Sequence, residues 1–237
     1  MKLFKNIAIL LIVLSCSLPA ISQTADQIIA KYIQSIGGAD VVKGIQSICM
    51  ESSSKMMGLN ITTKTTILNG LGFKTETTAM GNKQVACYTN SSGWIKEKNN
   101  KAEIMPEEQY EMGKSQIFIG SPFIDYAAQG YKITFIGKEK VDGKSANRIR
   151  MTRKNFTSDY WFDTSGGFLI KAFITTQMEG KEVEITMLYS EYTKTKIGYV
   201  MPLVTETKMG FMFSMTNHIT KYTIDEPVSE SVFRKPD

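Results

Sequence analysis

The sequence predicts a mainly β protein of the α+β class, in which antiparallel strands follow one another and one early helix packs on the sheet. Three observations support this. Apolar and polar residues alternate over most of the chain, glycine-containing turns separate these runs, and only one segment near the start shows clear helical spacing. An amphipathic helix must cover its apolar stripe, and a sheet face is the surface that this chain offers.

Residues 141–192 carry the clearest strand pattern. Within them Val183, Ile185 and Met187 alternate with glutamate and threonine, which is typical of a strand with one buried and one wet face. Glycines between the runs allow tight reversals. We therefore expect a four-stranded meander over residues 146–152, 158–163, 168–174 and 181–191.

The expected helix lies just before the first strands. Thr24 and Gln27 have the spacing of a capping box, and isoleucines then recur at helical spacing until Gly37 and Gly38 end the run. Residues 45–104 follow with frequent threonine, β-branched residues and regular turn signals. We expect about six strands there, with wet outer faces.

A segment of different composition begins at Pro106, which is followed by two glutamates, as in the first turn of a helix. Residues 122–129 resemble a second short helix. The intervening residues, 117–123, are apolar. Two interpretations stay open: these residues plug the core of the sheet, or they form a movable lid over a cavity.

The chain then returns to strand patterns over residues 198–215. Phe211, Phe213 and Met215 alternate onto one strand face. We expect the final turn to hold Phe233 against the rest of the fold.

The first 22 residues have the pattern of a secretory signal peptide: two lysines, an apolar run too short to span a bilayer, and small residues at the end. Cleavage after Ser22 would leave residues 23–237 as a single exported domain. Cys16 keeps a second interpretation open, because the residues before it loosely resemble a lipobox, in which the cysteine is acylated and anchors the chain to a membrane.

Charge and cysteine content restrict the partners. The chain has 28 basic and 23 acidic residues, a net charge of +5, which falls to +3 without the two lysines of the leader. No run of five like charges is present, so we expect no nucleic-acid partner. Cys49 and Cys87 lie in strands that are not sequence neighbours, which favours free thiols over the disulfide that export would permit.

Several catalytic classes lack their residues. His218 is the single histidine, which excludes a multi-histidine metal site and a His-Glu-x-x-His helix. A Gly-x-Ser-x-Gly elbow and a phosphate-binding glycine loop are also missing. We expect no enzyme, no metal and no cofactor.

The remaining candidates are soft apolar side chains, since the chain has 14 Met, 12 Phe and 10 Tyr. Methionine suits surfaces that accept variable apolar shapes, although ordinary core packing explains any single one. We expect a concave sheet with room for an acyl chain. The predicted lining of this apolar cleft is Ile29, Ile33, Phe73, Ile117, Phe118, Phe123, Ile170, Ile185, Met187, Phe211, Phe213 and Met215.

Short motifs spread over nearly all of residues 23–237 resemble the periplasmic lipoprotein-carrier superfamily, in the versions associated with Bacteroidetes. This superfamily includes the carrier that shuttles lipoproteins, its outer-membrane receptor and mycobacterial lipid-binding lipoproteins. The motifs are Ile36-Gly37-Gly38, Gly93-Trp94, Val141-Asp142-Gly143-Lys144, Tyr160-Trp161-Phe162-Asp163, Gly198-Tyr199-Val200-Met201-Pro202 and Phe233-Arg234-Lys235-Pro236.

The resemblance implies a strongly curved antiparallel sheet that forms an incomplete β-barrel of about 11 strands, with helices over its concave face. It further implies a non-catalytic periplasmic monomer that binds lipids or lipidated proteins, as in outer membrane lipoprotein sorting. An envelope protein-binding or sensor module of the same fold is the alternative. The cavity arginine of the family carrier has no counterpart here, because Arg148 and Arg150 are predicted on the face opposite Ile149 and Met151.

Intact-mass analysis of the exported protein should show a chain that begins at Gln23, because Ala20 and Ser22 are small residues at the positions that signal peptidase recognises. A mass matching a diacylated or triacylated chain that starts at Cys16 would contradict this prediction.

Overall fold

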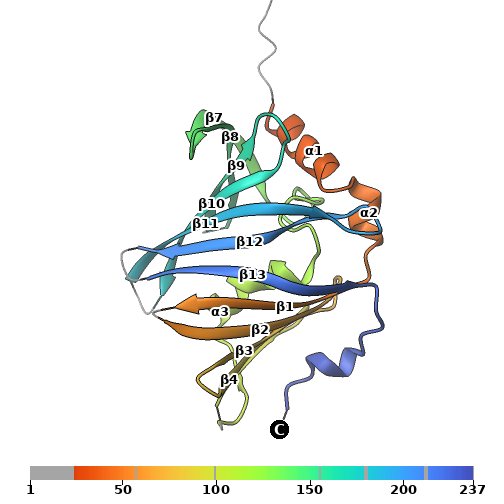
Figure 1. Cartoon of the computed structure of the whole chain (residues 1–237), viewed down its shortest axis with the longest axis vertical. Helices are drawn as coiled ribbons and strands as arrows, with labels where there is room; N and C mark the ends of the chain where they lie inside the picture. Colours follow the sequence, from red (N-terminus) through yellow and green to blue (C-terminus); the bar gives the residue numbers. More distant parts are fainter. Residues whose placement is uncertain are drawn as a thin grey trace, which may run out of the picture.

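The computed structural model describes residues 24–56, 58–98, 100–154, 156–178, 181–210 and 213–236. These residues form one open antiparallel sheet of 13 strands with three short α-helices (Figure 1). The helices are α1 (Ala25–Ser35), α2 (Ala39–Gly44) and α3 (Glu107–Gly113), with 3-10 turns η1 (Lys114–Ile117) and η2 (Glu230–Phe233). The early strands are β1 (Ser47–Met56), β2 (Leu59–Leu68), β3 (Gly72–Ala79), β4 (Asn82–Thr89), β5 (Gly93–Glu97) and β6 (Glu103–Ile104). The later strands are β7 (Lys132–Val141), β8 (Lys144–Arg153), β9 (Phe156–Asp163), β10 (Leu169–Met178), β11 (Lys181–Lys194), β12 (Val200–Met209) and β13 (Phe213–Ile224).

The sheet consists of two meanders that meet in its middle. Its strand order is β6-β5-β4-β3-β2-β1-β13-β12-β11-β10-β9-β8-β7, so only β1 and β13 pair without being sequence neighbours. The predicted six early strands and the four-stranded meander are both confirmed. The described sheet has 13 strands instead of about 11, and the lysine-rich edge strand β7 was not among the predicted strands.

The helix α1 begins at the predicted capping box. The Thr24 hydroxyl accepts a hydrogen bond from the backbone N–H of Gln27, and the Gln27 side chain accepts one from the backbone N–H of Thr24. Its residues Ile28 and Ile29 are almost fully buried against Phe162 and the neighbouring side chains of β8 to β10. The face of the sheet that α1 covers is called the concave face below, and the opposite face is the outer face.

The segment between β6 and β7 contains one of its two expected helices. The helix α3 begins after Pro106, as predicted. The prediction of a helix over residues 122–129 is wrong, because this part forms successive turns. Asp125 has a φ of 51°, which a right-handed helix does not allow, and the Gln129 side chain donates a hydrogen bond to the Ile124 carbonyl at 2.6 Å.

The C-terminal turn is fixed on the outer face. Phe233 is buried with Cys87 and Trp94, and the Trp94 indole N–H donates a hydrogen bond to the Phe233 carbonyl at 2.9 Å. This confirms the predicted anchor. Both described cysteines are free thiols, as expected, and burial raises the pKa of the Cys87 thiol to about 12.

A charged network lies on the outer face of β8 and β9, at the predicted face of Arg148 and Arg150. Both guanidinium groups donate hydrogen bonds to Asp159, which is 3 % exposed. Burial alone would raise the pKa of Asp159, but hydrogen bonds from the two arginines outweigh it and hold the pKa below its ordinary value. Arg148 also lies over the Trp161 ring, 4.9 Å from its centroid, so the network covers an outer apolar patch.

Replacing Asp159 with asparagine should lower the free energy of unfolding at pH 7 by about 3 kcal/mol, because the change removes a buried partner of two arginines. Denaturant unfolding measures this. The matched control is Glu51→Gln, which removes an exposed pair with Lys64 at 3.7 Å and should cost less than about 1 kcal/mol.

The effect of Asp159→Asn should also depend on pH. Because the folded-state pKa of Asp159 lies below its ordinary value of 3.8, its stabilisation is present above that pH and is lost as the pH falls through the lowered pKa. The difference between wild type and variant should therefore shrink in acid. A difference that stays constant down to the acid transition would show that Asp159 does not act through its charge.

Candidate ligand-binding site on the concave face

The helix α3 bridges two distant parts of the sheet. The Thr176 hydroxyl of β10 lies 3.1 Å from the Met112 sulfur, which accepts its hydrogen bond. The next residue, Gly113, lies against the Tyr88 ring of β4, where an added Cβ would come within 2.2 Å of a ring carbon. Six strands separate β4 from β10 in the sheet order. The sheet therefore curves so strongly that two consecutive residues of α3 contact β10 and β4. Figure 1 shows α3 behind β13 and β1.

Charged contacts also hold α3 to the end of β8. Glu111 forms an ion pair with Lys114 and lies 3.9 Å from both the Arg153 and the Lys154 side-chain nitrogens. The hydrogen bond from Lys114 lowers the pKa of Glu111, against the opposing effect of burial. Tyr110 donates a hydrogen bond to the Thr89 carbonyl at 2.9 Å, which connects α3 to the end of β4.

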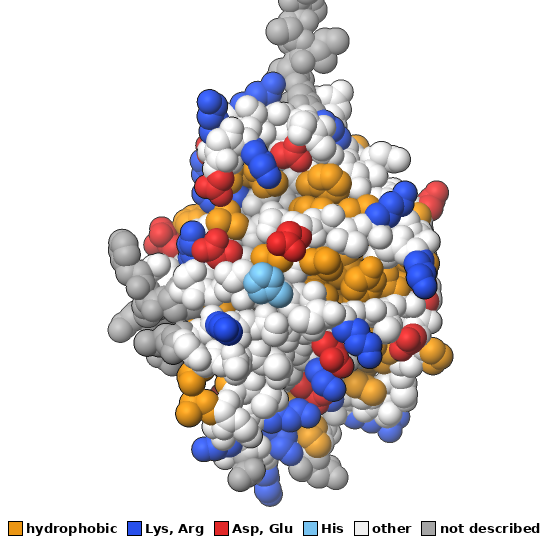
Figure 2. Space-filling model, viewed as in Figure 1, with side chains coloured by type: hydrophobic (Ala, Val, Ile, Leu, Met, Phe, Trp, Pro, Cys, Tyr) orange, Lys and Arg blue, Asp and Glu red, His pale blue; other side chains and the backbone are white. Residues whose placement is uncertain are grey.

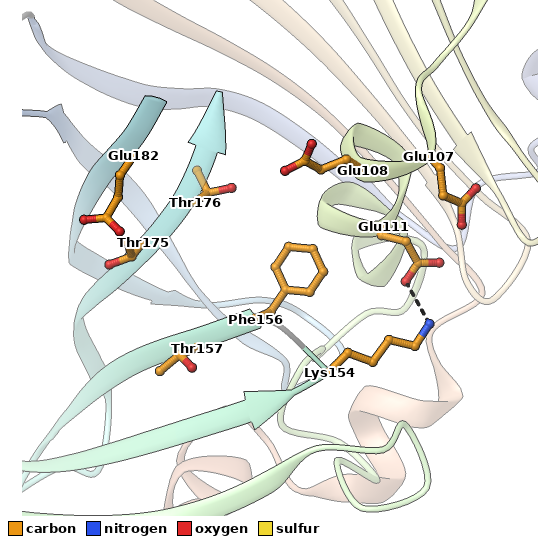
Figure 3. Close-up of a pocket in the computed structure, with 9 residues that line it drawn as sticks. All are labelled: Glu107, Glu108, Glu111, Lys154, Phe156, Thr157, Thr175, Thr176 and Glu182. Atoms are coloured by element: carbon orange, nitrogen blue, oxygen red, sulfur yellow. Dashed lines mark ion pairs between the residues drawn. The ribbon is translucent and has the colours of Figure 1, made fainter. Parts of the chain in front are cut away.

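A cavity of about 760 Å³ lies between α3 and the ends of β9, β10 and β11 (Figure 3). In the close-up the Phe156 ring points into the space between the strands and α3, and Glu108 faces Thr176 across it. The lining residues are Glu107, Glu108, Glu111, Lys154, Phe156, Thr157, Thr175, Thr176 and Glu182. This space is thus mixed in character, with carboxylates around an aromatic ring, and the sequence analysis did not predict its acidic part.

The concave face beneath α1 is filled by the protein itself. Phe123 is 2 % exposed and packs edge-on against Tyr32 and Tyr160, with ring centroids 4.9 Å apart in both pairs. Ile117 is equally buried, and Ile29 belongs to the same core as Phe123. This packing favours the plug interpretation of residues 117–123 over the lid.

The concave face of the central strands is more open. The strand register places Ile185, Met187, Met215 and Phe73 there, as predicted, and each of these side chains is only partly buried. Ile33 is also partly buried and packs between the two larger core clusters. Phe73 and Met187 pack against the core clusters, so these residues form an apolar surface that is partly covered and partly exposed.

Threonine and serine occupy much of this same surface. Thr63 and Thr77 are directly opposite each other on β2 and β3, with their hydroxyl oxygens 3.2 Å apart, and Ser52 is opposite Thr63 on β1. The sequence analysis missed them because the threonine-rich strands were explained by wet outer faces alone. The available signal was that threonine also falls on the strand face of Ile61 and Ile67.

Four other predicted cleft residues have a different outcome. The prediction that Ile170 faces the concave side is wrong: a register shift between Leu169 and Lys171 turns it to the outer face, where it packs with Trp161. Phe118 is 43 % exposed and lies beside Gly70, at the end of the sheet. Phe211 lies outside the described residues, as does the side chain of Phe213.

The sequence matches no protein-family model and no curated protein. Solved structures do resemble it. A LolA superfamily protein from Nitrosomonas europaea has a TM-score of 0.60 at 11% identity, covering 90% of this chain and 99% of that one. A DUF1329 family protein from Desulfovibrio piger has a TM-score of 0.60 at 12% identity, with 90% and 98% covered. A domain described as an outer membrane lipoprotein-sorting protein, from Vibrio parahaemolyticus, has a TM-score of 0.55 at 13% identity, with 80% and 89% covered.

The chain has the lipoprotein-carrier fold. At these identities the likeness concerns the fold alone, and the association with Bacteroidetes stays a prediction. None of the three descriptions names a catalytic activity. The described residues contain no helix with the length and apolar character needed to cross a membrane. They also contain no group of three or more His, Cys, Asp or Glu side chains arranged to hold a metal ion.

Replacing Gly113 with alanine should destabilise this lipoprotein-carrier fold by about 1–3 kcal/mol, the usual cost of overpacking, because the new methyl group would overlap the Tyr88 ring. Helix propensity alone would favour alanine, so the sign of the change is informative. Thermal unfolding gives the measurement.

The control for this change is a Tyr88→Leu background, which removes the ring atoms that meet the methyl group. In that background Gly113→Ala should cost little or become stabilising. An equal cost in both backgrounds would mean that α3 does not rest on Tyr88.

Proposed function

We propose that this protein is a non-catalytic carrier that binds an acyl chain of a lipid or lipidated protein on its concave face. The observation that carries the proposal is the unfilled part of this face. The sheet curves around α3, yet Ile185, Met187 and Met215 remain only partly buried. Apolar side chains that line a concave, incompletely packed surface are suited to bind an apolar ligand.

The energetics of such binding are sufficient. Each buried methylene contributes about 0.8 kcal/mol, so a long acyl chain contributes on the order of 10 kcal/mol before the cost of ordering is subtracted. The cavity next to α3 adjoins this surface at Thr176. The Thr176 side chain lines the cavity and donates a hydrogen bond to the Met112 sulfur. A carrier needs this kind of reversible, non-covalent site.

One carboxylate of the cavity is unsuited to general acid catalysis. Glu111 is its most constrained carboxylate, and its pKa is lowered by the hydrogen bond from Lys114, so it stays ionised at neutral pH. A general acid needs the opposite shift. His218 is exposed on the outer face, away from the concave residues.

The proposed site of action is the periplasm. This rests on the leader pattern of residues 1–22, which lie outside the described residues, and on the lipoprotein-carrier fold. Acylation at Cys16 would instead anchor the same domain to a membrane.

Replacing Met215 with aspartate should weaken binding of the uncharged probe N-phenyl-1-naphthylamine at least about tenfold, because the change puts an unpaired charge among apolar side chains. Fluorescence titration gives the affinity. Met215→Leu is the matched control: it keeps an apolar side chain of similar volume and should bind almost as the wild type does.

Circular dichroism of both variants separates lost binding from lost folding. Native mass spectrometry of protein purified from its source should also show a co-purifying lipid. If the folded wild type takes up no acyl-chain probe in a saturable manner, the carrier proposal fails and the concave face is only a core.

A further inference from the structure

A continuous band of uncharged polar side chains crosses the concave face of the central strands. Along one row, Ser52, Thr63, Thr77 and Gln84 are opposite one another on β1, β2, β3 and β4. Beside it, Thr205, Asn217 and Ser54 form a second row on β12, β13 and β1. We call these seven residues the hydroxyl band. Such groups both donate and accept hydrogen bonds, and they carry no charge.

One member of the band lies deeper than the others named here. Ser54 is 6 % exposed. Its neighbours across the ladder are Asn217 on one side and Ile61 on the other. The Ser54 hydroxyl can donate to or accept from a polar group that a ligand brings to this position.

The band contrasts with the outer face of the same strands. In the described parts of β12, β13 and β1 to β4, the register places every lysine, glutamate and histidine on the outer face. There they form pairs such as Lys64 with Glu51, and Lys74 and Lys83 with Glu76. Figure 2 shows this outer face, with charged side chains scattered over it around the single histidine.

We infer that the ligand of this protein is an amphiphile with an uncharged head group rich in hydroxyl or amide groups, which the hydroxyl band binds. This inference rests on the proposed function: the acyl chain lies on the apolar side chains, and the head group lies on the band. Hydroxyl side chains can satisfy such a head group without any counter-charge.

Charged head groups fit this surface poorly. A phosphate group moved onto the band would lose hydration without gaining an opposite charge, which is costly. An ammonium group would meet one carboxylate at the edge of the band, that of Glu97, which accepts a hydrogen bond from Gln84. Anionic lipids would also meet the carboxylates of Glu108 and Glu111 at the neighbouring cavity. A cationic head group placed at those carboxylates is the main competitor, and the experiment must separate it from an uncharged one.

The test compares four ligands with the same twelve-carbon chain: sucrose monolaurate, monolauroylglycerol, lauroyl lysophosphatidylglycerol and laurylamine. Each displaces N-phenyl-1-naphthylamine from the full-length mature protein, below its micelle concentration. The two uncharged ligands should bind at least about tenfold more tightly than the two charged ones, because only the charged heads lose hydration without compensation. Comparing the affinities of sucrose monolaurate and monolauroylglycerol then shows whether the site prefers a sugar or a smaller polyol head group.

A pair of double variants assigns the preference to the band. Thr63→Val with Thr77→Val removes the two hydroxyls that meet on the concave face and keeps β-branched side chains. It should reduce the preference for uncharged heads at least about threefold while probe binding persists. Thr62→Val with Thr78→Val changes the directly opposed pair one position along the same strands, on the outer face, and should leave the preference unchanged.

The outcomes separate this inference from the carrier proposal. Equal affinity for all four ligands, a preference for laurylamine or for the phosphate head, or no effect of the concave double variant would overturn the head-group inference while acyl-chain binding stands. Failure of every ligand and of the probe to bind the folded protein would overturn the carrier proposal itself.

Discussion

The crossing of residues 105–131 from one edge of the sheet to the other is the constraint on which the architecture depends. β6 and β7 are consecutive in sequence but lie at opposite edges of the 13-stranded order. This connection is folded into α3, η1 and successive turns, so it joins the two edges only because the sheet curves until they approach each other. The contacts of Met112 with Thr176 and of Gly113 with Tyr88 show where this happens. The curvature, the cavity beside α3 and the burial of Phe123 all follow from that one crossing.

Side-chain size then divides the concave face into a filled part and an open part. On β8 and β9, large side chains such as Ile149, Met151 and Phe162 interdigitate with α1 and exclude solvent. On β1, β2 and β3 the middle of this face holds the smaller side chains of Ser52, Thr63 and Thr77. Under the proposed function, one continuous sheet therefore serves as a core at one end and as the binding surface in the middle.

Much of this arrangement could be predicted from local pattern. Alternation identified the strand faces of Ile185 and Met187, and the capping box placed the start of α1, because these features depend on neighbours in sequence. Ile170 could not be placed this way, since a register shift beside Leu169 reverses its face and is set by pairing with β9. The acidic cavity could not be predicted either. It forms where the α3 glutamates face β9 to β11, and these strands lie more than 40 residues later in the chain. The hydroxyl band had a visible signal, but threonine on a strand is usually attributed to solvent.

The uncharged polar lining also bears on a difficulty that the proposed carrier function raises for the protein without its ligand. A purely apolar concave face of this extent would invite self-association whenever the ligand left. Hydroxyl groups such as those of Thr63, Thr65 and Thr75 can be hydrated when the surface is empty, and they exchange that water for a ligand at little cost. Charged groups would hydrate the empty surface still better, but they would oppose the entry of an acyl chain. Serine and threonine beside a few methionines therefore suit the proposed function, because such a surface can be hydrated when empty and can still contact apolar groups of a ligand.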